Sequence, residues 1–178
     1  MQQLEKKITA QVMEFAELDP LDRALLYRAY AARQNAQAPY SRFYVGAAVR
    51  PATESGNRVY VGCNVERCSY TQTTHAEQNA IDSMVADRGP TKIAAVAIVA
   101  APADAAFDFP PAAAKLEQPI AFSAPCGHCL QIIWENCNGD PDVRLIDLSA
   151  SGRILVTTIG SALPMRFGPE ALGISLFK

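Results

Sequence analysis

The sequences THAEQNA at residues 74–80 and PCGHC at residues 125–129 hold the side chains that best indicate both fold and chemistry. His75 precedes one set of apolar residues at helical spacing, and Cys126 and Cys129 begin another. Imidazole and thiolate are common protein ligands of zinc, and a catalytic zinc site keeps three protein ligands and one open position. We therefore predict a Zn²⁺ site formed by His75, Cys126 and Cys129.

The pattern around the two motifs predicts how they meet. A helix after His75 should end at Gly89-Pro90, and the apolar run from Ile93 to Ala100 predicts a buried strand. A further helix follows Cys126. With right-handed crossovers, both helices would begin beyond the carboxyl ends of neighbouring parallel strands, at one edge of the sheet. The partial positive charge of the helix starts should then lower the pKa values of the thiols.

Glu77 is the candidate proton shuttle. It lies two residues after His75, and in the middle of a helix such residues point about 200° apart. A helix boundary at His75 would let Glu77 lean toward a metal-bound water without ligating the metal. That position suits general acid and base catalysis.

The remaining pattern predicts one mixed α/β domain over residues 1–178. The spacing of Leu4, Ile8, Val12 and Phe15 predicts an N-terminal helical extension over about residues 1–19, and Asp19-Pro20 should start a second helix. In the segment 102–124 the apolar residues show no clear helical or strand periodicity. The segment is also too long for an ordinary connection, so we interpret it as an insertion or lid. Further strands are predicted at 43–50, 58–64, 143–148 and 154–159, with hairpin turns at 54–57 and 149–152.

Composition excludes several classes of function. The 178 residues include 16 basic and 18 acidic side chains, a net charge of -2, without a basic block, so we expect no nucleic-acid partner. The longest apolar run, residues 93–101, is far shorter than the roughly 20 residues of a membrane span. Without a recognisable export signal, we expect a cytoplasmic protein. Its five cysteines then favour metal or catalytic roles over disulfides.

Other interpretations of the cysteines stay open. A Cys-x-x-Cys pair alone also occurs in redox motifs and structural zinc sites, so a non-catalytic zinc module is an alternative function. A closed structural site would need a fourth ligand, and we interpret His128 as a neighbour of the site rather than that ligand. Cys63, Cys68 and Cys137 form an alternative metal set, but packing in the core is the better interpretation for all three.

Five segments together resemble the motifs of cytidine deaminases: APYSRFYVGAA (38–48), GCNVE (62–66), the two zinc motifs, and LPMRFGP (163–169). The H-x-E and P-C-x-x-C pair is the signature of zinc-dependent deaminases. The resemblance covers about residues 38–172. It implies a three-layer αβα sandwich on a five-stranded mixed sheet, with the last two strands antiparallel, and a homo-oligomer with shared active sites. It also implies hydrolysis of cytidine and deoxycytidine to uridine and deoxyuridine plus ammonia, with zinc-bound hydroxide attacking carbon 4.

The resemblance implies roles for single residues. Phe43 would stack on the base, and Asn64 and Glu66 would hold the 3'-hydroxyl of the sugar. The Ala76 backbone and Glu77 would read the pyrimidine edge. By the same resemblance, Phe167 would close a site from a neighbouring subunit.

Two departures from the family pattern bear on assembly and substrate. His75 stands where the short tetrameric members usually have cysteine and matches the two-domain dimeric members, while Gln78 replaces an arginine of the tetrameric type. Because we find no second, degenerate domain, dimer and tetramer both stay open. The insertion at 102–124 leaves deamination of modified cytosine nucleosides as an alternative, whereas Asn64, Glu66 and the acidic charge disfavour a polynucleotide substrate.

Overall fold

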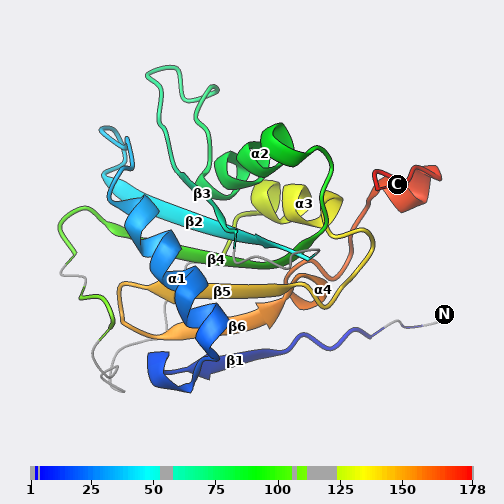
Figure 1. Ribbon diagram of the computed structural model, residues 1–178, viewed down its shortest axis with the longest axis horizontal. Helices are drawn as coiled ribbons and strands as arrows, with labels where there is room; N and C mark the ends of the chain where they lie inside the picture. The colour runs from blue at the N-terminus through cyan, green and yellow to red at the C-terminus, as the bar shows by residue number, and fades with distance from the viewer. Residues whose placement is uncertain (1–2, 4, 53–57, 106–107, 112–123, 178) are drawn as a thin grey trace.

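The structure is a computed structural model that describes residues 3, 5–52, 58–105, 108–111 and 124–177. Within that part of the chain, six strands form one mixed sheet in the order β1-β6-β5-β4-β2-β3 (Figure 1). The elements are β1 (Ala10–Met13), η1 (Phe15–Glu17), α1 (Pro20–Arg33), β2 (Phe43–Pro51), β3 (Tyr60–Cys63), α2 (Ala76–Arg88), β4 (Ile93–Pro102), α3 (Gly127–Glu135), β5 (Arg144–Ser149), β6 (Ile154–Thr158), α4 (Ile159–Ala162) and η2 (Pro169–Leu172).

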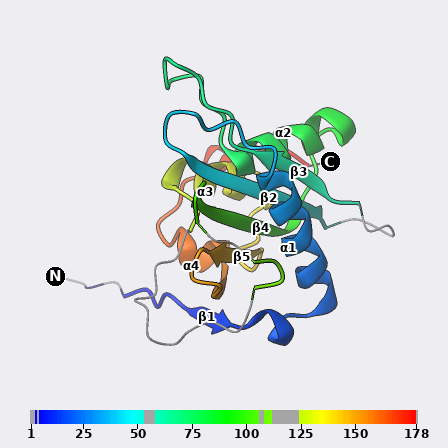
Figure 2. The ribbon, with the colours of Figure 1, turned by 90° about the vertical axis from the view of Figure 1, so that its left-hand side faces the viewer.

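Helices cover both faces of the sheet, as the predicted three-layer sandwich requires. Leu25, Leu26 and Ala29 of α1 pack on one face, while side chains of α2 and α3 pack on the other. Figure 2 shows α1 on the opposite side of the sheet from α3 and α4. β4 and β5 are parallel and the other neighbouring pairs are antiparallel, including the predicted final hairpin of β5 and β6.

Local sequence signals account for the helix ends. Asp19 accepts a hydrogen bond of 2.9 Å from the backbone of Asp22, and Pro20 occupies the first position of α1. Gly89 ends α2 with a φ of 72°, a left-handed value that glycine adopts without strain. Both boundaries confirm the predictions made from these residues.

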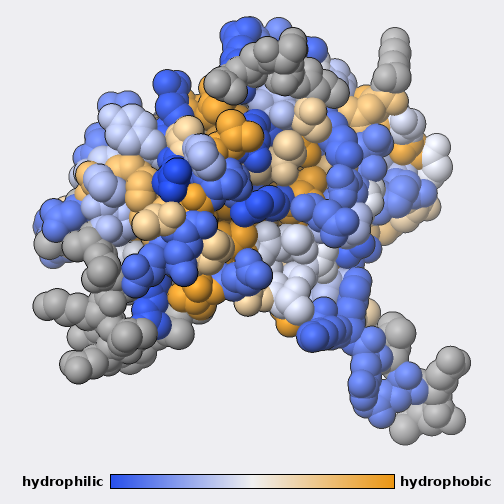
Figure 3. All heavy atoms as spheres, turned by 60° about the horizontal axis from the view of Figure 1, so that its bottom comes forward, coloured by the Kyte–Doolittle hydropathy of each residue, from blue (hydrophilic) through white to orange (hydrophobic). Residues whose placement is uncertain are grey.

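The predicted N-terminal helix is wrong, and the sheet has six strands rather than five. β1 runs antiparallel to β6, and only the short turn η1 separates it from α1. The β-branched side chains of Ile8, Thr9 and Val12 favour an extended chain, and the edge of β6 supplies backbone partners. A short surface helix would gain neither. Figure 3 shows the chain before β1 as a mainly hydrophilic arm beside the globular body.

The predicted turn at 54–57 and residues 106–107 and 112–123 of the insertion lie outside the described residues. Of the insertion's described part, Phe109 stacks on Tyr30 of α1 at 4.5 Å between ring centroids. Ala124, at the other end, lines the pocket that contains His75. The interpretation of the segment as a lid therefore stays a prediction. In the described part of the chain, no helix combines the length and the apolar character needed to cross a bilayer.

The topology brings the starts of α2 and α3 to one edge of the sheet by a route that differs from the prediction. β3 and β4 point in the same direction because both are antiparallel to β2, which lies between them. The strands that precede the two helices are therefore not neighbours. Gly62 of β3 allows α2 to approach closely, since a Cβ there would lie 2.5 Å from the Ala76 oxygen.

We expect Gly62→Ala to lower the free energy of unfolding by about 1–3 kcal/mol, because backbone atoms of α2 would have to move. Urea unfolding measures this change. Gly127→Ala is the matched control, since a Cβ at Gly127 meets no atom of the described residues outside its own helix turn within 4 Å. A Gly62→Ala protein as stable as this control would show that the close approach of α2 and β3 is not a constraint.

Candidate active site

The three predicted zinc ligands converge at the starts of two helices. His75 and Cys126 are the N-cap residues of α2 and α3, both with extended backbone, and Cys129 lies in the first turn of α3. His75 Nδ1 lies 3.5 Å from Cys126 Sγ and 3.3 Å from Cys129 Sγ. Among the described residues, these three form the group whose ligand atoms all lie within 4.8 Å of one another.

This arrangement fits zinc. Bonds of about 2.3 Å to sulfur and 2.0 Å to nitrogen at tetrahedral angles separate ligand atoms by roughly 3.5 Å. The nitrogen-to-sulfur distances of 3.5 and 3.3 Å match that separation. His75 would bind through Nδ1, and three donors leave a fourth position open.

The prediction that the helix starts lower the thiol pKa values is wrong for Cys129. Burial raises the pKa of the Cys129 thiol, and Glu77 and Cys126 raise it further. The thiolate form therefore needs a cation beside it, and the positive end of a short helix is insufficient. This need is a second reason to expect a metal at the site.

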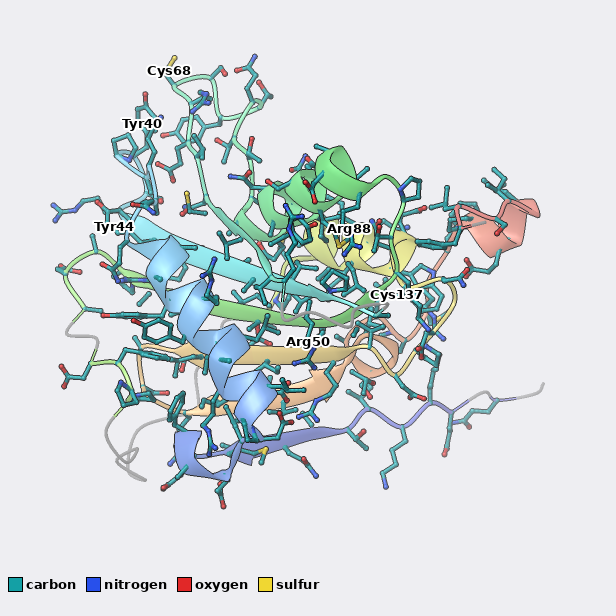
Figure 4. The ribbon with its side chains drawn as sticks, viewed as in Figure 1. Tyr40, Tyr44, Arg50, Cys68, Arg88 and Cys137 are labelled. Atoms are coloured by element: carbon teal, nitrogen blue, oxygen red, sulfur yellow. The ribbon has the colours of Figure 1, made fainter. Side chains whose placement is uncertain are left out.

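The other candidate ligands lie elsewhere. His128 is exposed, and its Nε2 lies 3.4 Å from Gln78 Oε1, which agrees with its interpretation as a neighbour of the site. Cys68 and Cys137 lie far apart in Figure 4, so the alternative cysteine set does not converge. Cys137 is buried as predicted, but Cys68 is exposed and Cys63 half-buried, so core packing is wrong for Cys68 and only partly right for Cys63.

Glu77 occupies the first turn of α2 and is 5% exposed. Its carboxylate is close enough to the Cys129 thiol to raise that thiol's pKa by charge and by a hydrogen bond. Because α2 begins after His75, the two side chains reach the same cavity despite their separation of two residues. The helix boundary that the sequence predicts here is confirmed.

Four of the five predicted substrate residues line one cavity of about 550 Å³. This volume lies within the range of small-molecule sites. The predicted ligands His75 and Cys126 and the candidate shuttle Glu77 line the same cavity. The predicted substrate residues in its wall are Phe43, Asn64, Glu66 and Ala76, and its other lining residues are Ser41, Val45, Thr73, Ile98, Ala100 and Ala124.

Asn64 and Glu66 are fixed by backbone groups of the neighbouring strand and loop. Glu66 Oε2 accepts hydrogen bonds from the backbone of Tyr40 at 2.9 Å and of Ser41 at 3.2 Å. A hydrogen bond from the Ser41 side chain lowers the pKa of Glu66, so its carboxyl group is ionised near neutral pH. Asn64 donates to the Phe43 oxygen and accepts from the Val45 nitrogen, both at 2.9 Å. Each side chain keeps hydrogen-bonding capacity for a ligand.

Phe167 does not line this cavity. It is 59% exposed and borders a separate depression with Trp134 and Arg166. Its backbone oxygen accepts a hydrogen bond of 2.9 Å from Gln131. The role of Phe167 in a neighbouring subunit's site stays a prediction.

Asp147 of β5 is a buried acid that sequence reasoning missed. It is 1% exposed, and neither carboxyl oxygen has a hydrogen-bond partner in the described chain. Burial raises its pKa well above the usual range, and the charge of Glu77 raises it further. Strand alternation places Asp147 on the face that carries α2 and α3. An acidic residue at an inward position of the apolar strand RLIDLS is the signal that could have found it.

Comparison with known proteins identifies relatives of this chain. Residues 20–140 match the family described as "Cytidine and deoxycytidylate deaminase zinc-binding region". A cytidine deaminase of Sporosarcina psychrophila is 37% identical over 148 residues, 83% of this chain and 92% of that protein. One from Halalkalibacterium halodurans is 34% identical over 151 residues, 84% and 97% of the two chains. The crystal structure of a Burkholderia pseudomallei cytidine deaminase superposes with a TM-score of 0.62 at 36% identity, covering 81% and 97%.

We expect Asp147→Asn to stabilise the fold at pH 7 by more than about 1 kcal/mol. The unfolded chain ionises this carboxyl group above its ordinary pKa, whereas the folded chain keeps it protonated, so folding takes up a proton. Wild-type stability should therefore fall, relative to the variant, as pH rises.

Urea unfolding between about pH 5.5 and 8 measures this difference. Asp82→Asn is the control, because Asp82 is exposed on α2. A stability difference that does not change with pH would contradict the protonated state of Asp147.

Proposed function

The chain belongs to the cytidine deaminase family of zinc hydrolases, and from this premise we propose that it converts cytidine and deoxycytidine into uridine and deoxyuridine with release of ammonia. One observation carries the proposal. Two of the zinc ligands, His75 and Cys126, share one cavity of about 550 Å³ with a buried glutamate and residues suited to a nucleoside. A structural zinc module would have no need of such a cavity, nor of an open fourth position.

His75, Cys126 and Cys129 would hold the metal. When bound, zinc lowers the pKa of a coordinated water from 15.7 to about 7 and so supplies hydroxide at neutral pH. Glu77 would take up one proton of the attacking water and deliver it to ring nitrogen 3 while the water oxygen bonds to carbon 4. It would then take up the proton of the new carbon-4 hydroxyl group and deliver it to the amine, so that the C–N bond breaks and ammonia leaves. Its burial keeps bulk water from competing for these protons.

The rest of the cavity orients the nucleoside. Phe43 offers its ring to the base, and the Ala76 backbone and Glu77 face the pyrimidine edge. Asn64 and Glu66 bind the sugar 3'-hydroxyl, and two backbone hydrogen bonds to Oε2 hold the Glu66 carboxylate in place for this contact. Together the two side chains donate to and accept from one hydroxyl group.

We also propose a homo-oligomer, dimer or tetramer, that works in the cytoplasm. The segment with Met165 and Phe167 supports an interface, because these side chains are 88% and 59% exposed. Large apolar side chains gathered on a surface favour contact with another protein. Phe167 would reach a neighbouring subunit's cavity from this segment.

Glu77→Gln should reduce kcat for cytidine by about a hundred- to ten-thousand-fold while zinc content stays the same, because the shuttle is lost but the ligands are not. Loss of ultraviolet absorbance of cytidine and metal analysis of one sample measure both quantities. Asp82→Asn removes a carboxylate from an exposed position of the same helix and is the control. Retention of near-normal turnover by Glu77→Gln would rule out the proposed shuttle.

Glu66→Gln should lower kcat/KM for cytidine at least about tenfold, because a charged acceptor of the 3'-hydroxyl is lost. The effect on 3'-deoxycytidine should be small, since that substrate lacks the hydroxyl group. Steady-state kinetics with both nucleosides test this difference. An equal loss for both substrates would mean that Glu66 only holds the loop at Tyr40 and Ser41.

A further inference from the structure

A second groove lies on the face of the sheet that carries α1, outside the catalytic cavity. It has a volume of about 580 Å³, within the range of small-molecule sites. Leu21, Ala24 and Leu25 of α1 and Val59 before β3 give it an apolar floor, and Tyr27 borders it. Among the described residues, its charged lining consists of three arginines and no acidic residue: Arg28, Arg50 and Arg58.

Arg28 supplies an uncompensated positive charge. It is exposed at the same face of α1 as Leu21 and Leu25, with the helical spacing i, i+4, i+7. It has no hydrogen-bond or ion-pair partner in the described part of the chain. An exposed arginine without a partner is common, so Arg28 alone does not indicate a site.

Arg50 gives the independent second observation. Its Nη2 lies 3.4 Å from Asp22 Oδ1, but Arg144 lies closer to the same carboxylate, at 2.5 Å. Two guanidinium groups therefore share one buried carboxylate. The single carboxylate therefore neutralises only half of the positive charge of Arg50 and Arg144, so part of the charge of Arg50 stays uncompensated beside the groove.

The third arginine is better compensated. Arg58 pairs with Asp87 at 3.0 Å and lies over the Tyr60 ring at 5.2 Å from its centroid. The described residues of the groove therefore carry more positive than negative charge beside an apolar floor. Such a combination suits an anion carried on an apolar body, because guanidinium groups bind phosphate through several directed hydrogen bonds.

The groove is separate from the catalytic cavity. Figure 4 shows Tyr44 and Arg50 toward opposite ends of β2. Phe43 and Val45 line the catalytic cavity, and Arg50 lines the groove. Seven residues of extended chain from Phe43 to Arg50 correspond to roughly 23 Å. One small ligand cannot occupy both places.

We propose that this groove binds a small phosphate ester of an aromatic or similarly flat apolar group. The phosphate lies between the guanidinium groups of Arg28 and Arg50. The flat group lies on Leu21 and Val59 beside Tyr27. This inference rests on the groove alone and does not depend on the proposed deaminase activity.

Titration calorimetry of the zinc-loaded protein with phenyl phosphate tests the proposal. We expect saturable binding with a dissociation constant on the order of 1 mM or tighter, and weaker binding of inorganic phosphate and of phenol. Arg28→Gln and Arg50→Gln should each weaken phenyl phosphate binding at least about tenfold. Arg23→Gln removes an arginine of the same helix that does not line the groove and should leave binding unchanged.

Three results would overturn the proposal. They are absence of saturable binding, binding of inorganic phosphate as tight as that of phenyl phosphate, and equal binding by wild type and Arg28→Gln. Thermal melting of each variant verifies that it is folded, which matters most for Arg50→Gln because Asp22 loses a partner. Turnover of cytidine by Arg28→Gln should equal that of wild type, which separates this groove from the catalytic cavity.

Discussion

The need to neutralise buried negative charge where two helices begin governs the rest of the structure. Cys126, Cys129 and Glu77 would place three anionic groups in one partly buried volume, and burial together with mutual repulsion raises the pKa of Cys129. The N-termini of α2 and α3 contribute partial positive charge but do not offset these groups. A divalent cation held by His75 and the two sulfurs does, and this is why fold and metal site are best understood together.

The sheet provides the geometry that this site requires. β2 lies between β3 and β4 in the sheet. The helices that follow β3 and β4 nevertheless begin at the same edge, so residues 75 and 126 meet despite their distance in sequence. Gly62 sets the depth at which α2 lies on β3. Asn64 and Glu66, just beyond β3, then face the cavity with their amide and carboxylate fixed by the backbone of β2 and the preceding loop. The proposed ligands, proton shuttle and sugar contacts all follow β3 or β4 in the chain.

Much of this arrangement follows from the sequence because its signals are local. Asp19-Pro20, His75 and Gly89-Pro90 mark helix boundaries through capping and backbone preferences, and the spacing of the two motifs predicts the metal ligands. The features that the sequence did not predict correctly depend on tertiary contacts. The helical spacing of residues 4–15 competes with pairing to an open strand edge, and nothing local shows that β6 offers one. Likewise, the protonation state of Asp147 depends on the side chains that surround β5. The groove with Arg28 and Arg50 is formed by segments that are remote in sequence.

Diffraction from crystals of the zinc-loaded protein, collected on both sides of the zinc absorption edge, tests the central claim most directly. The account predicts one anomalous peak at the starts of α2 and α3, with bonds of about 2.0 Å to His75 Nδ1 and about 2.3 Å to the sulfurs of Cys126 and Cys129. Solvent should occupy the fourth position, within reach of Glu77. A metal bound elsewhere, or a fourth position filled by His128 or Glu77, would contradict it.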